Sequence, residues 1–213
     1  MKKVAFIYLN IDHYEPPFES VVQVVSKDIE FSVHHFTDEN FPPRKCAITP
    51  RLQSKIHKFF GWQIVPDYDI YVWVDSGFAM HREDSMAWLL KHLGSNDIVF
   101  LKHPTRETVG EEADFLKENL PKSNRLMKRY TNELLDEEMK VIGRKGKLYA
   151  GGIFAYKNTP KVQKAMKEWW YHTSRFHLDD QLSASYVFKD CKVKVVDEPY
   201  YGSKYFTFIR KHK

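Results

Sequence analysis

Short, continuously apolar segments recur along the sequence, and segments with helical periodicity separate them. The apolar segments are residues 4–9, 70–74, 98–101 and 153–156, with less regular strand-like segments at 29–36 and 193–196. A strand that is apolar at every position is typical of a sheet covered on both faces. Apolar residues recur at helical spacing in residues 51–62, 84–93, 124–142, 160–170 and 179–188. This alternation predicts an α/β fold, with a Rossmann-like, mostly parallel sheet sandwiched by helices.

Length and composition favour a single domain over residues 1–213. Of the 213 residues, 43% are hydrophobic and 15% aromatic, which is enough for a sizeable core and excludes a disordered chain. Residues 104–147 are charged and helical in pattern and carry no strand signal, so we expect a helical insertion there. The residues from about 199 to 213 form a basic and aromatic C-terminal tail.

The sequence also carries signals about compartment and partners. No apolar run reaches the roughly 18 residues that a membrane span needs, and the run at residues 4–9 is short for a secretory signal. The two cysteines, Cys46 and Cys191, are too few for a disulfide framework. We therefore expect a cytoplasmic protein with no membrane anchor. The net charge of +5 permits an anionic partner but is also common among enzymes without one.

The apolar segment at residues 70–74 is followed directly by Asp75, Ser76 and Gly77. In open α/β sheets, ligands bind at the carboxyl ends of the strands. A carboxylate at such a strand end can hold Mg²⁺ or Mn²⁺ against phosphate oxygens, because these hard cations prefer oxygen ligands. The structural alternative is an Asp-Ser-Gly turn in which Asp75 caps the next segment.

A second acidic site opens the last predicted helix, where Asp179 and Asp180 precede Gln181 and Ser183. Acids at a helix N-terminus are favoured by capping and by the helix dipole, so a purely structural role is one interpretation. Capping uses one carboxylate, however. The second acid and the neighbouring polar groups have the donors and acceptors that suit sugar hydroxyls.

Paired glycines, Gly151 and Gly152, precede the apolar segment at residues 153–156. Glycine permits close approach of the backbone to a ligand, although a simple turn would explain the pair equally well. Neither a P-loop pattern nor the Gly-x-Gly-x-x-Gly fingerprint of dinucleotide-binding folds occurs in the sequence. The glycines therefore give no support to a dinucleotide site.

Taken in order, these segments resemble the GT-A type of nucleotide-sugar glycosyltransferase, and in detail the glycosyltransferase-like DUF616 family. The matching segments are Arg51 and Lys55 on one helix, residues 73–77, residues 103–106 followed by Glu111 and Glu112, Trp169 and Trp170, and residues 180–183. The resemblance covers roughly residues 3–188. It implies a GT-A-like fold and transfer of a sugar from a nucleotide-diphosphate sugar to an acceptor.

The resemblance also implies roles for individual residues. The donor-binding set would be Asp75, Arg51, Lys55, Gly151, Gly152, Gln181, His103 and Arg106. The catalytic pair would be Asp179 and Asp180, one binding sugar hydroxyls and one acting as general base. For at least one of the two, and for Asp180 in particular, we expect an alanine substitution to lower activity by orders of magnitude with only a small change in melting temperature.

A divalent metal, Mn²⁺ or Mg²⁺, is the cofactor that the resemblance implies. Many GT-A enzymes carry an Asp-x-Asp motif, whereas here Asp75 alone is followed by Ser and Gly. Asp67 and Asp69 do form Asp-x-Asp, but they precede the strand and would lie at its wrong end. The metal would therefore rest on Asp75 and on His212, which matches by position a C-terminal histidine that completes the metal shell in related enzymes.

The sequence leaves the acceptor and two other functions open. The acceptor is a glycan or a polyanion such as modified DNA, because basic and aromatic residues alternate in the tail. The same pattern suits a non-catalytic nucleic-acid or glycan binding module. A sugar nucleotidyltransferase is a further alternative, but it needs a glycine-rich loop after the first strand, and residues 10–14 contain no glycine.

Overall fold

The computed structural model describes residues 1–12, 20–42, 48–119 and 132–209. Its main sheet has six strands in the order β2-β1-β3-β6-β5-β7. Their bounds are Lys2–Asn10 for β1, Ile29–Thr37 for β2, Ile70–Asp75 for β3, Ile98–Lys102 for β5, Tyr149–Lys157 for β6 and Val193–Val196 for β7. Only β6 runs antiparallel to its neighbours, so the other five strands share one direction. The predicted mostly parallel α/β sheet is confirmed.

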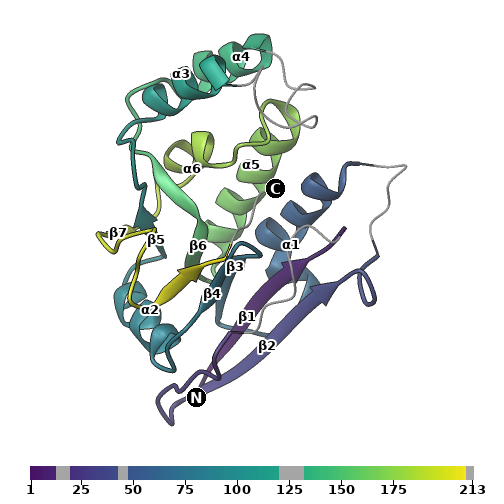
Figure 1. The fold of residues 1–213 in the computed structure, drawn as a ribbon, viewed down its shortest axis with the longest axis vertical. Coiled ribbons are helices and arrows are strands. Elements are labelled where there is room, and N and C mark those ends of the chain that lie inside the picture. The colour runs from purple at the N-terminus through teal and green to yellow at the C-terminus, as the bar shows by residue number, and fades with distance from the viewer. Residues whose placement is uncertain (13–19, 43–47, 120–131, 210–213) are drawn as a thin grey trace.

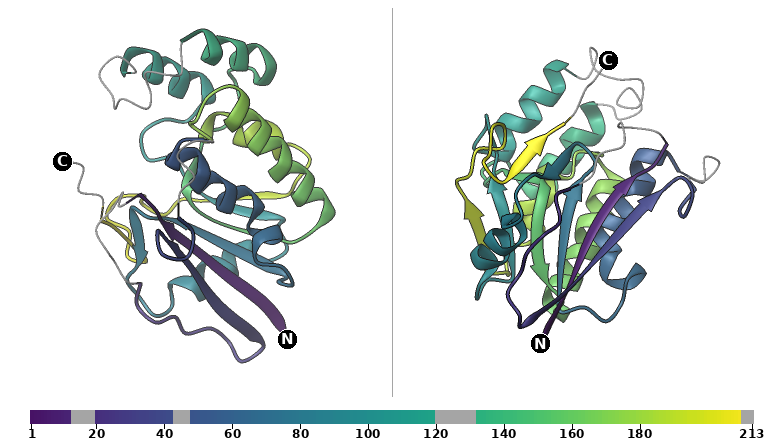
Figure 2. Two further views of the ribbon diagram at one scale, coloured as in Figure 1. Left: turned by 90° about the vertical axis from the view of Figure 1, so that its right-hand side faces the viewer. Right: turned by 60° about the horizontal axis from the view of Figure 1, so that its bottom comes forward.

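Helices cover both faces of this sheet (Figures 1 and 2). The helices of the described residues, including two that lie beyond the sheet, are α1 (Pro50–Ile64), α2 (Ser85–Leu93), α3 (Val109–Asn119), α4 (Asn132–Ile142), α5 (Pro160–Arg175) and α6 (Gln181–Val187). Helices α1 and α5 each begin at a proline after a threonine, and the threonine hydroxyl accepts a hydrogen bond from a backbone N–H of the first turn. This start satisfies one otherwise unpaired N–H and fits the fixed φ of proline.

The core lies on both sides of the sheet, which explains why the strand segments are apolar throughout. On one face, alternate residues of β1 pack with Phe59 of α1 and Trp169 of α5. On the other face, the intervening β1 residues belong to a cluster that contains Met86 and Leu89 of α2. Val4 and Ala5, which point to opposite faces, are both fully buried. A strand buried on both faces needs apolar residues at consecutive positions.

Two short strands form a second sheet that the sequence did not predict. Strand β4 (Phe78–Met80) pairs antiparallel with β8 (Phe206–Phe208). The aromatic residues of the tail are therefore packed against the domain up to residue 209: the ring of Tyr205 stacks on Trp88 at 4.4 Å, and Phe208 contacts Phe78 at 4.9 Å. Tyr205 and Phe208 thus pack on Trp88 and Phe78 of the domain and do not lie in a free tail.

The predicted helical insertion at residues 104–147 contains α3 and α4, which pack against α6 at one end of the molecule (Figure 1). Its described residues contribute no strand to either sheet; their only β pairing is an isolated bridge between Thr108 and Lys147. The predicted helix at 124–142 begins, within the described residues, at Asn132. No helix in the described part of the chain is long and apolar enough to cross a membrane.

Candidate functional site

A cleft of about 420 Å³ opens at the edge of the sheet where β1 and β3 end. Because β6 runs antiparallel to β3, its first residues lie at this same edge. The loop after β5 and the N-terminal ends of α1 and α6 complete the walls. The carboxyl ends of parallel strands thus gather side chains from distant parts of the sequence, as the position of Asp75 predicted.

The cleft brings together every predicted site residue that lies in the described part of the chain. These residues are Arg51, Lys55, Asp75, His103, Arg106, Gly151, Gly152, Asp179, Asp180 and Gln181. His212, the predicted second metal ligand, lies outside the described residues. Asp69 lies at the start of β3, at the opposite end of the strand from Asp75, and accepts a hydrogen bond from the Lys3 backbone N–H at 2.9 Å.

Two lysines of α1 share the carboxylate of Asp180. Oδ2 of Asp180 accepts hydrogen bonds from Nζ of Lys55 and from Nζ of Lys58, the latter at 2.7 Å. Burial alone would raise the pKa of Asp180, but the charges of Lys55 and Lys58 outweigh it and hold the pKa below its usual value. Asp180 is only 3% exposed, so this buried carboxylate is ionised and paired at neutral pH.

Lys58 is a site residue that the sequence analysis missed. Its side chain is 1% exposed, and its Nζ lies 3.7 Å from Oδ1 of Asp75 as well as in contact with Asp180. Burial tends to lower the pKa of Lys58, but Asp180 and Asp75 together raise it above the ordinary value. The available signal was its spacing, three residues after Lys55 and therefore on the same helix face.

The helical spacing of apolar residues in 51–62 predicts an apolar inner face, but the inner face of α1 is not uniformly apolar. Leu52 and Phe59 are buried, whereas Ile56 and Phe60 are only partly buried. Polar residues take their place in the interior: Gln53, His57 and Lys58. A buried lysine interrupts the apolar pattern of a helix face, and its burial is tolerated only because acids of other elements, Asp75 and Asp180, neutralise its charge.

Asp75 faces the cleft with a partly exposed side chain. Its Oδ1 accepts a hydrogen bond from Nε1 of the buried Trp73 at 2.6 Å, and 40% of its side chain remains exposed. Trp73 lies two residues earlier on the same strand, so both side chains point to the same face of the sheet. The tryptophan N–H therefore fixes the orientation of the carboxylate, while the exposed part remains accessible from the cleft.

The glycine pair lies within β6 and does not precede it, which corrects the predicted turn. A Cβ added at Gly151 would come within 2.8 Å of Oδ1 of Asp180, and one at Gly152 within 2.3 Å of the Tyr200 hydroxyl. The glycines are needed because acidic and aromatic side chains pass close to the strand. The close approach is thus to Asp180 and Tyr200, which are themselves part of the cleft wall.

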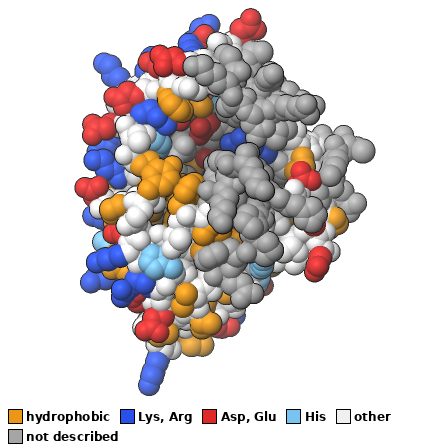
Figure 3. All heavy atoms as spheres, in the orientation of Figure 1, with side chains coloured by type: hydrophobic (Ala, Val, Ile, Leu, Met, Phe, Trp, Pro, Cys, Tyr) orange, Lys and Arg blue, Asp and Glu red, His pale blue; other side chains and the backbone are white. Residues whose placement is uncertain are grey.

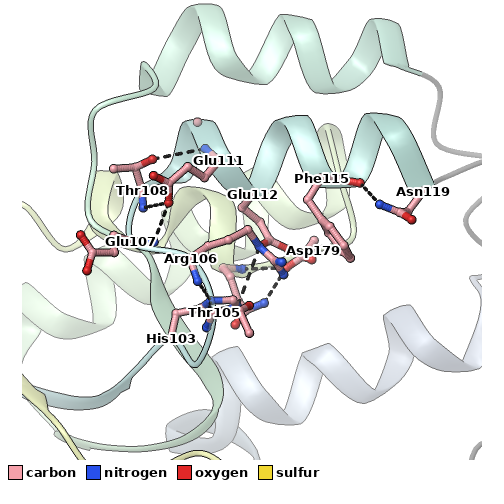
Figure 4. Close-up of polar contacts among 12 residues, drawn as sticks. His103, Thr105, Arg106, Glu107, Thr108, Glu111, Glu112, Phe115, Asn119 and Asp179 are labelled. Carbon is pink, nitrogen blue, oxygen red and sulfur yellow. Dashed lines mark hydrogen bonds and ion pairs between the residues drawn. The ribbon is translucent and has the colours of Figure 1, made fainter.

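Arg106 is held in place by a buried carboxylate and an aromatic ring (Figure 4). Its Nε donates to Glu112, which is 2% exposed, and its guanidinium carbon lies 3.9 Å from the ring centre of Phe115. Burial, together with the negative charge of Asp179, raises the pKa of Glu112 to about 7 despite the neighbouring Arg106. The sequence flagged Arg106 and Glu112 as one motif, and the structure shows that they are paired.

His103 is uncharged at neutral pH. Burial, and then the positive charge of Arg106, lowers the pKa of His103 to about 4. Its Nδ1 accepts a hydrogen bond from the Arg106 backbone N–H at 3.1 Å, so Nε2 carries the proton of the neutral ring. His103 therefore shapes the loop after β5 and presents an N–H at Nε2.

The two acids before α6 differ in their environment. Asp180 makes no side-chain capping bond, whereas Oδ1 of Asp179 accepts from the backbone N–H and the side-chain amide of Gln181 at 3.2 and 3.3 Å. Gln181 in turn accepts from the Gly151 N–H at 3.2 Å, so its carbonyl oxygen is engaged within the protein. The capping interpretation thus fits Asp179 in part and does not fit Asp180.

The described residues do not form a multidentate metal centre. Among residues 1–12, 20–42, 48–119 and 132–209, no group of three or more His, Cys, Asp or Glu side chains is arranged to hold a metal ion. At Asp75, Oδ1 is already engaged by Trp73 and the Lys58 ammonium lies 3.7 Å away. A metal here would have one protein carboxylate oxygen available from the described residues, so the site fits a resident divalent cation poorly.

Comparisons with known proteins leave the family of this chain open. No protein-family model and no curated protein matches the sequence. One solved structure, titled "Crystal Structure of A197 from STIV", aligns with 92% of this chain and 82% of its own, at 11% sequence identity and a TM-score of 0.35. A likeness this low carries no information about function.

Proposed function

We propose that this protein transfers a sugar from a nucleotide-diphosphate sugar to an acceptor, in the manner of the GT-A and DUF616-like enzymes that its motifs resemble. The observation that carries the proposal is the composition of the cleft at the strand ends. Its lining includes the cationic side chains of Arg51 and Lys55 from α1 together with the carboxylates of Asp75 and Asp179. Cations that suit a diphosphate thus lie within one small cleft beside carboxylates that suit sugar hydroxyls.

The proposed mechanism follows from the change in charge as the glycosidic bond breaks. The departing diphosphate becomes more negative, so a fixed cation beside it lowers the barrier. Lys55, and with it Arg51 and Arg106, would supply positive charge around the phosphates. Asp75, oriented by Trp73, would accept hydrogen bonds from hydroxyls of the donor.

A general base is needed to take the proton of the acceptor hydroxyl. Asp180 is poorly suited, because two lysines hold its pKa down and its carboxylate is buried between them. Asp179 lines the cleft, and its Oδ1 accepts hydrogen bonds from the backbone N–H and the side-chain amide of Gln181. We therefore propose Asp179 as the base or hydroxyl ligand and Asp180 as the residue that positions the lysines.

Aromatic side chains on the cleft wall support a ring-shaped ligand. The aromatic residues that line the cleft are Trp73, Phe78, Tyr200, Tyr201 and Phe208. Tyr201 is 54% exposed and packs edge-on against Phe208 at 5.0 Å. Aromatic faces bind nucleobases and the apolar faces of sugars by stacking, so this wall suits either end of a nucleotide sugar.

The acceptor is proposed as a glycan, with a polyanion such as DNA as the second class. The last residues of the basic tail that motivated DNA lie outside the described residues, and Arg144, a basic residue of the helical insertion, is paired with Asp114 at 2.6 Å. On the face in Figure 3, acidic and basic side chains are interspersed along the left edge. A surface of mixed charge favours a glycan acceptor over a polyanion. Binding to DNA with an affinity that falls steeply as the salt concentration rises would instead favour the polyanion.

The experiment that tests the proposed function is release of free nucleotide from a panel of nucleotide sugars. We expect wild-type protein to release nucleotide from at least one donor, and Asp75→Asn to reduce release by orders of magnitude without unfolding. Asp69→Asn is the matched control, because it changes an acid at the other end of the same strand. No release from any donor, or equal release by the Asp75 variant, would argue for a binding module instead.

A further inference from the structure

The space between the two acids of the cleft is held by an ammonium group. Nζ of Lys58 lies 2.7 Å from Oδ2 of Asp180 and 3.7 Å from Oδ1 of Asp75, and its side chain is 1% exposed. Asp75 lies at the end of β3 and Asp180 directly precedes α6, and a pair of acids from two such elements is where a divalent cation would be expected to bind. In this chain a protein cation is built into that position.

The Lys58 ammonium is enclosed by three elements of the fold, so its ion pairs are not chance contacts on the surface. Gly151 leaves room for it, because an added Cβ would come within 2.8 Å of Oδ1 of Asp180 and 3.3 Å of Nζ of Lys58. A buried lysine without paired acids would be strongly destabilising. Any other residue at position 151 would press on this pair, so strand β6, helix α1 and the start of α6 together define the site.

Positive charge extends from this buried pair into the cleft. Lys55 contacts the same oxygen of Asp180 as Lys58 does, and its side chain lines the cleft with 13% exposed. One carboxylate is thus shared by two ammonium groups. Burial, followed by repulsion from Lys58, acts to lower the pKa of Lys55, and the net shift is downward although Asp180 opposes it. An anion beside Lys55 would relieve this repulsion.

We propose that Lys55, backed by the buried Lys58 and Asp180, binds the diphosphate of the donor directly, so that donor binding and transfer require no divalent metal. This inference rests on the proposed function for the identity of the anion. It replaces the expected Mn²⁺ or Mg²⁺ by the ammonium groups of Lys55 and Lys58, in agreement with the poor fit of the described residues to a metal.

The transfer step balances with these groups alone. The bond between the anomeric carbon and the diphosphate oxygen breaks, and its electron pair goes to the diphosphate beside Lys55. The acceptor oxygen forms the new bond to the anomeric carbon, and its proton goes to a carboxylate, which we place at Asp179. The charge gained by the leaving group is stabilised by the Lys55 ammonium, with no other reactant.

The test is calorimetric titration of the full chain with inorganic pyrophosphate in excess EDTA. We expect the wild type to bind, Lys55→Gln to bind at least about tenfold more weakly, and Lys55→Arg to recover most of the affinity. Lys91→Gln, an exposed lysine of α2 outside the cleft, is the matched control. Melting temperatures of all variants separate lost binding from lost folding.

Each outcome decides the inference. No binding by the wild type in EDTA, binding that appears only when MgCl₂ is added, or equal binding by Lys55→Gln would overturn it. Nucleotide release separates it from the proposed function: release only with added metal keeps the transferase and removes this inference. Pyrophosphate binding in EDTA without release from any nucleotide sugar keeps the anion site and removes the transferase.

Discussion

Replacing Asp180 by Asn tests whether its ion pairs hold the cleft together. The change is nearly isosteric but removes the charge that two lysines share. Among the described residues, Lys58, which is 1% exposed, would keep an ion pair only with Asp75, whose Oδ1 lies 3.7 Å from its Nζ. Breaking a buried pair by removing one partner costs about 3–5 kcal/mol. We therefore expect a large loss of stability, contrary to the small change in melting temperature expected from the sequence.

The size of this loss makes it easy to measure. In a domain of 150–250 residues, each kcal/mol lowers the melting temperature by about 2–4 °C, so the expected decrease is on the order of 10 °C. Thermal and urea unfolding should agree if the transition is two-state. Asp179→Asn is the control, since the carboxylate of Asp179 accepts its hydrogen bonds from the adjacent Gln181, and the change should cost about 1 kcal/mol.

A second variant separates charge burial from general damage to the fold. In Asp180→Asn with Lys58→Met, the lysine that lost its partner is replaced by an apolar side chain. We expect the double variant to be more stable than Asp180→Asn alone, because no unpaired ammonium remains at position 58. If Asp180→Asn unfolds within about 1 kcal/mol of the wild type, the ion pairs do not hold α6 to α1 and the reasoning fails.

Three further substitutions probe the groups around the cleft and the core. The pKa of Glu112 is about 7, against an ordinary 4.5, so between these pH values the folded protein keeps a proton that the unfolded chain loses. The free energy of unfolding of the wild type therefore falls as pH rises from 4.5 to 7, and Glu112→Gln should gain about 3 kcal/mol of stability relative to the wild type over this range. Parallel stability–pH curves of the two proteins would contradict this. His57 is 1% exposed, lies between the rings of Phe36 and Phe41, and has no hydrogen-bond partner among the described residues. Because burial lowers the pKa of His57 from 6.5 to about 4, the wild type should lose stability relative to His57→Leu as pH falls through this range. Chemical denaturation of both proteins at several pH values measures this difference, and a difference that does not change with pH would contradict it. Gly152→Ala should displace the Tyr200 hydroxyl and weaken nucleotide binding several-fold, and adding Tyr200→Phe should restore binding. Titration of the single and double variants with nucleotide checks this, and unchanged binding by Gly152→Ala would show that the position of the Tyr200 hydroxyl does not matter for binding.

The elements of the main sheet could be predicted because burial on both faces leaves a strong pattern. The segments at residues 4–9 and 70–74 are apolar at every position, and both are central strands. Strands β4 and β8 could not be predicted in this way, since each has three residues and depends on a partner more than 100 positions away. Their pairing is decided by tertiary packing, on which local pattern has little influence.

The cleft could be predicted in outline and not in its interactions. Asp75 was found from its place at a strand end, a rule that follows from sheet topology. Lys58 was missed because a lysine inside an apolar helix face has no local explanation; its partners come from β3 and from the start of α6. Gly151 and Gly152 were singled out from the sequence, but the reason for them was not, because Asp180 and Tyr200 come near the strand only in the folded chain.

The most direct test of the account is a crystal structure with a bound nucleoside diphosphate, prepared in the presence of EDTA. The account predicts the diphosphate in the cleft, with its oxygens within hydrogen-bond distance of the Lys55 ammonium and its ribose or base against the aromatic wall. The nearest protein acid to the sugar side should be Asp75 or Asp179. A nucleotide bound elsewhere on the protein, or an empty cleft at saturating nucleotide, would contradict it.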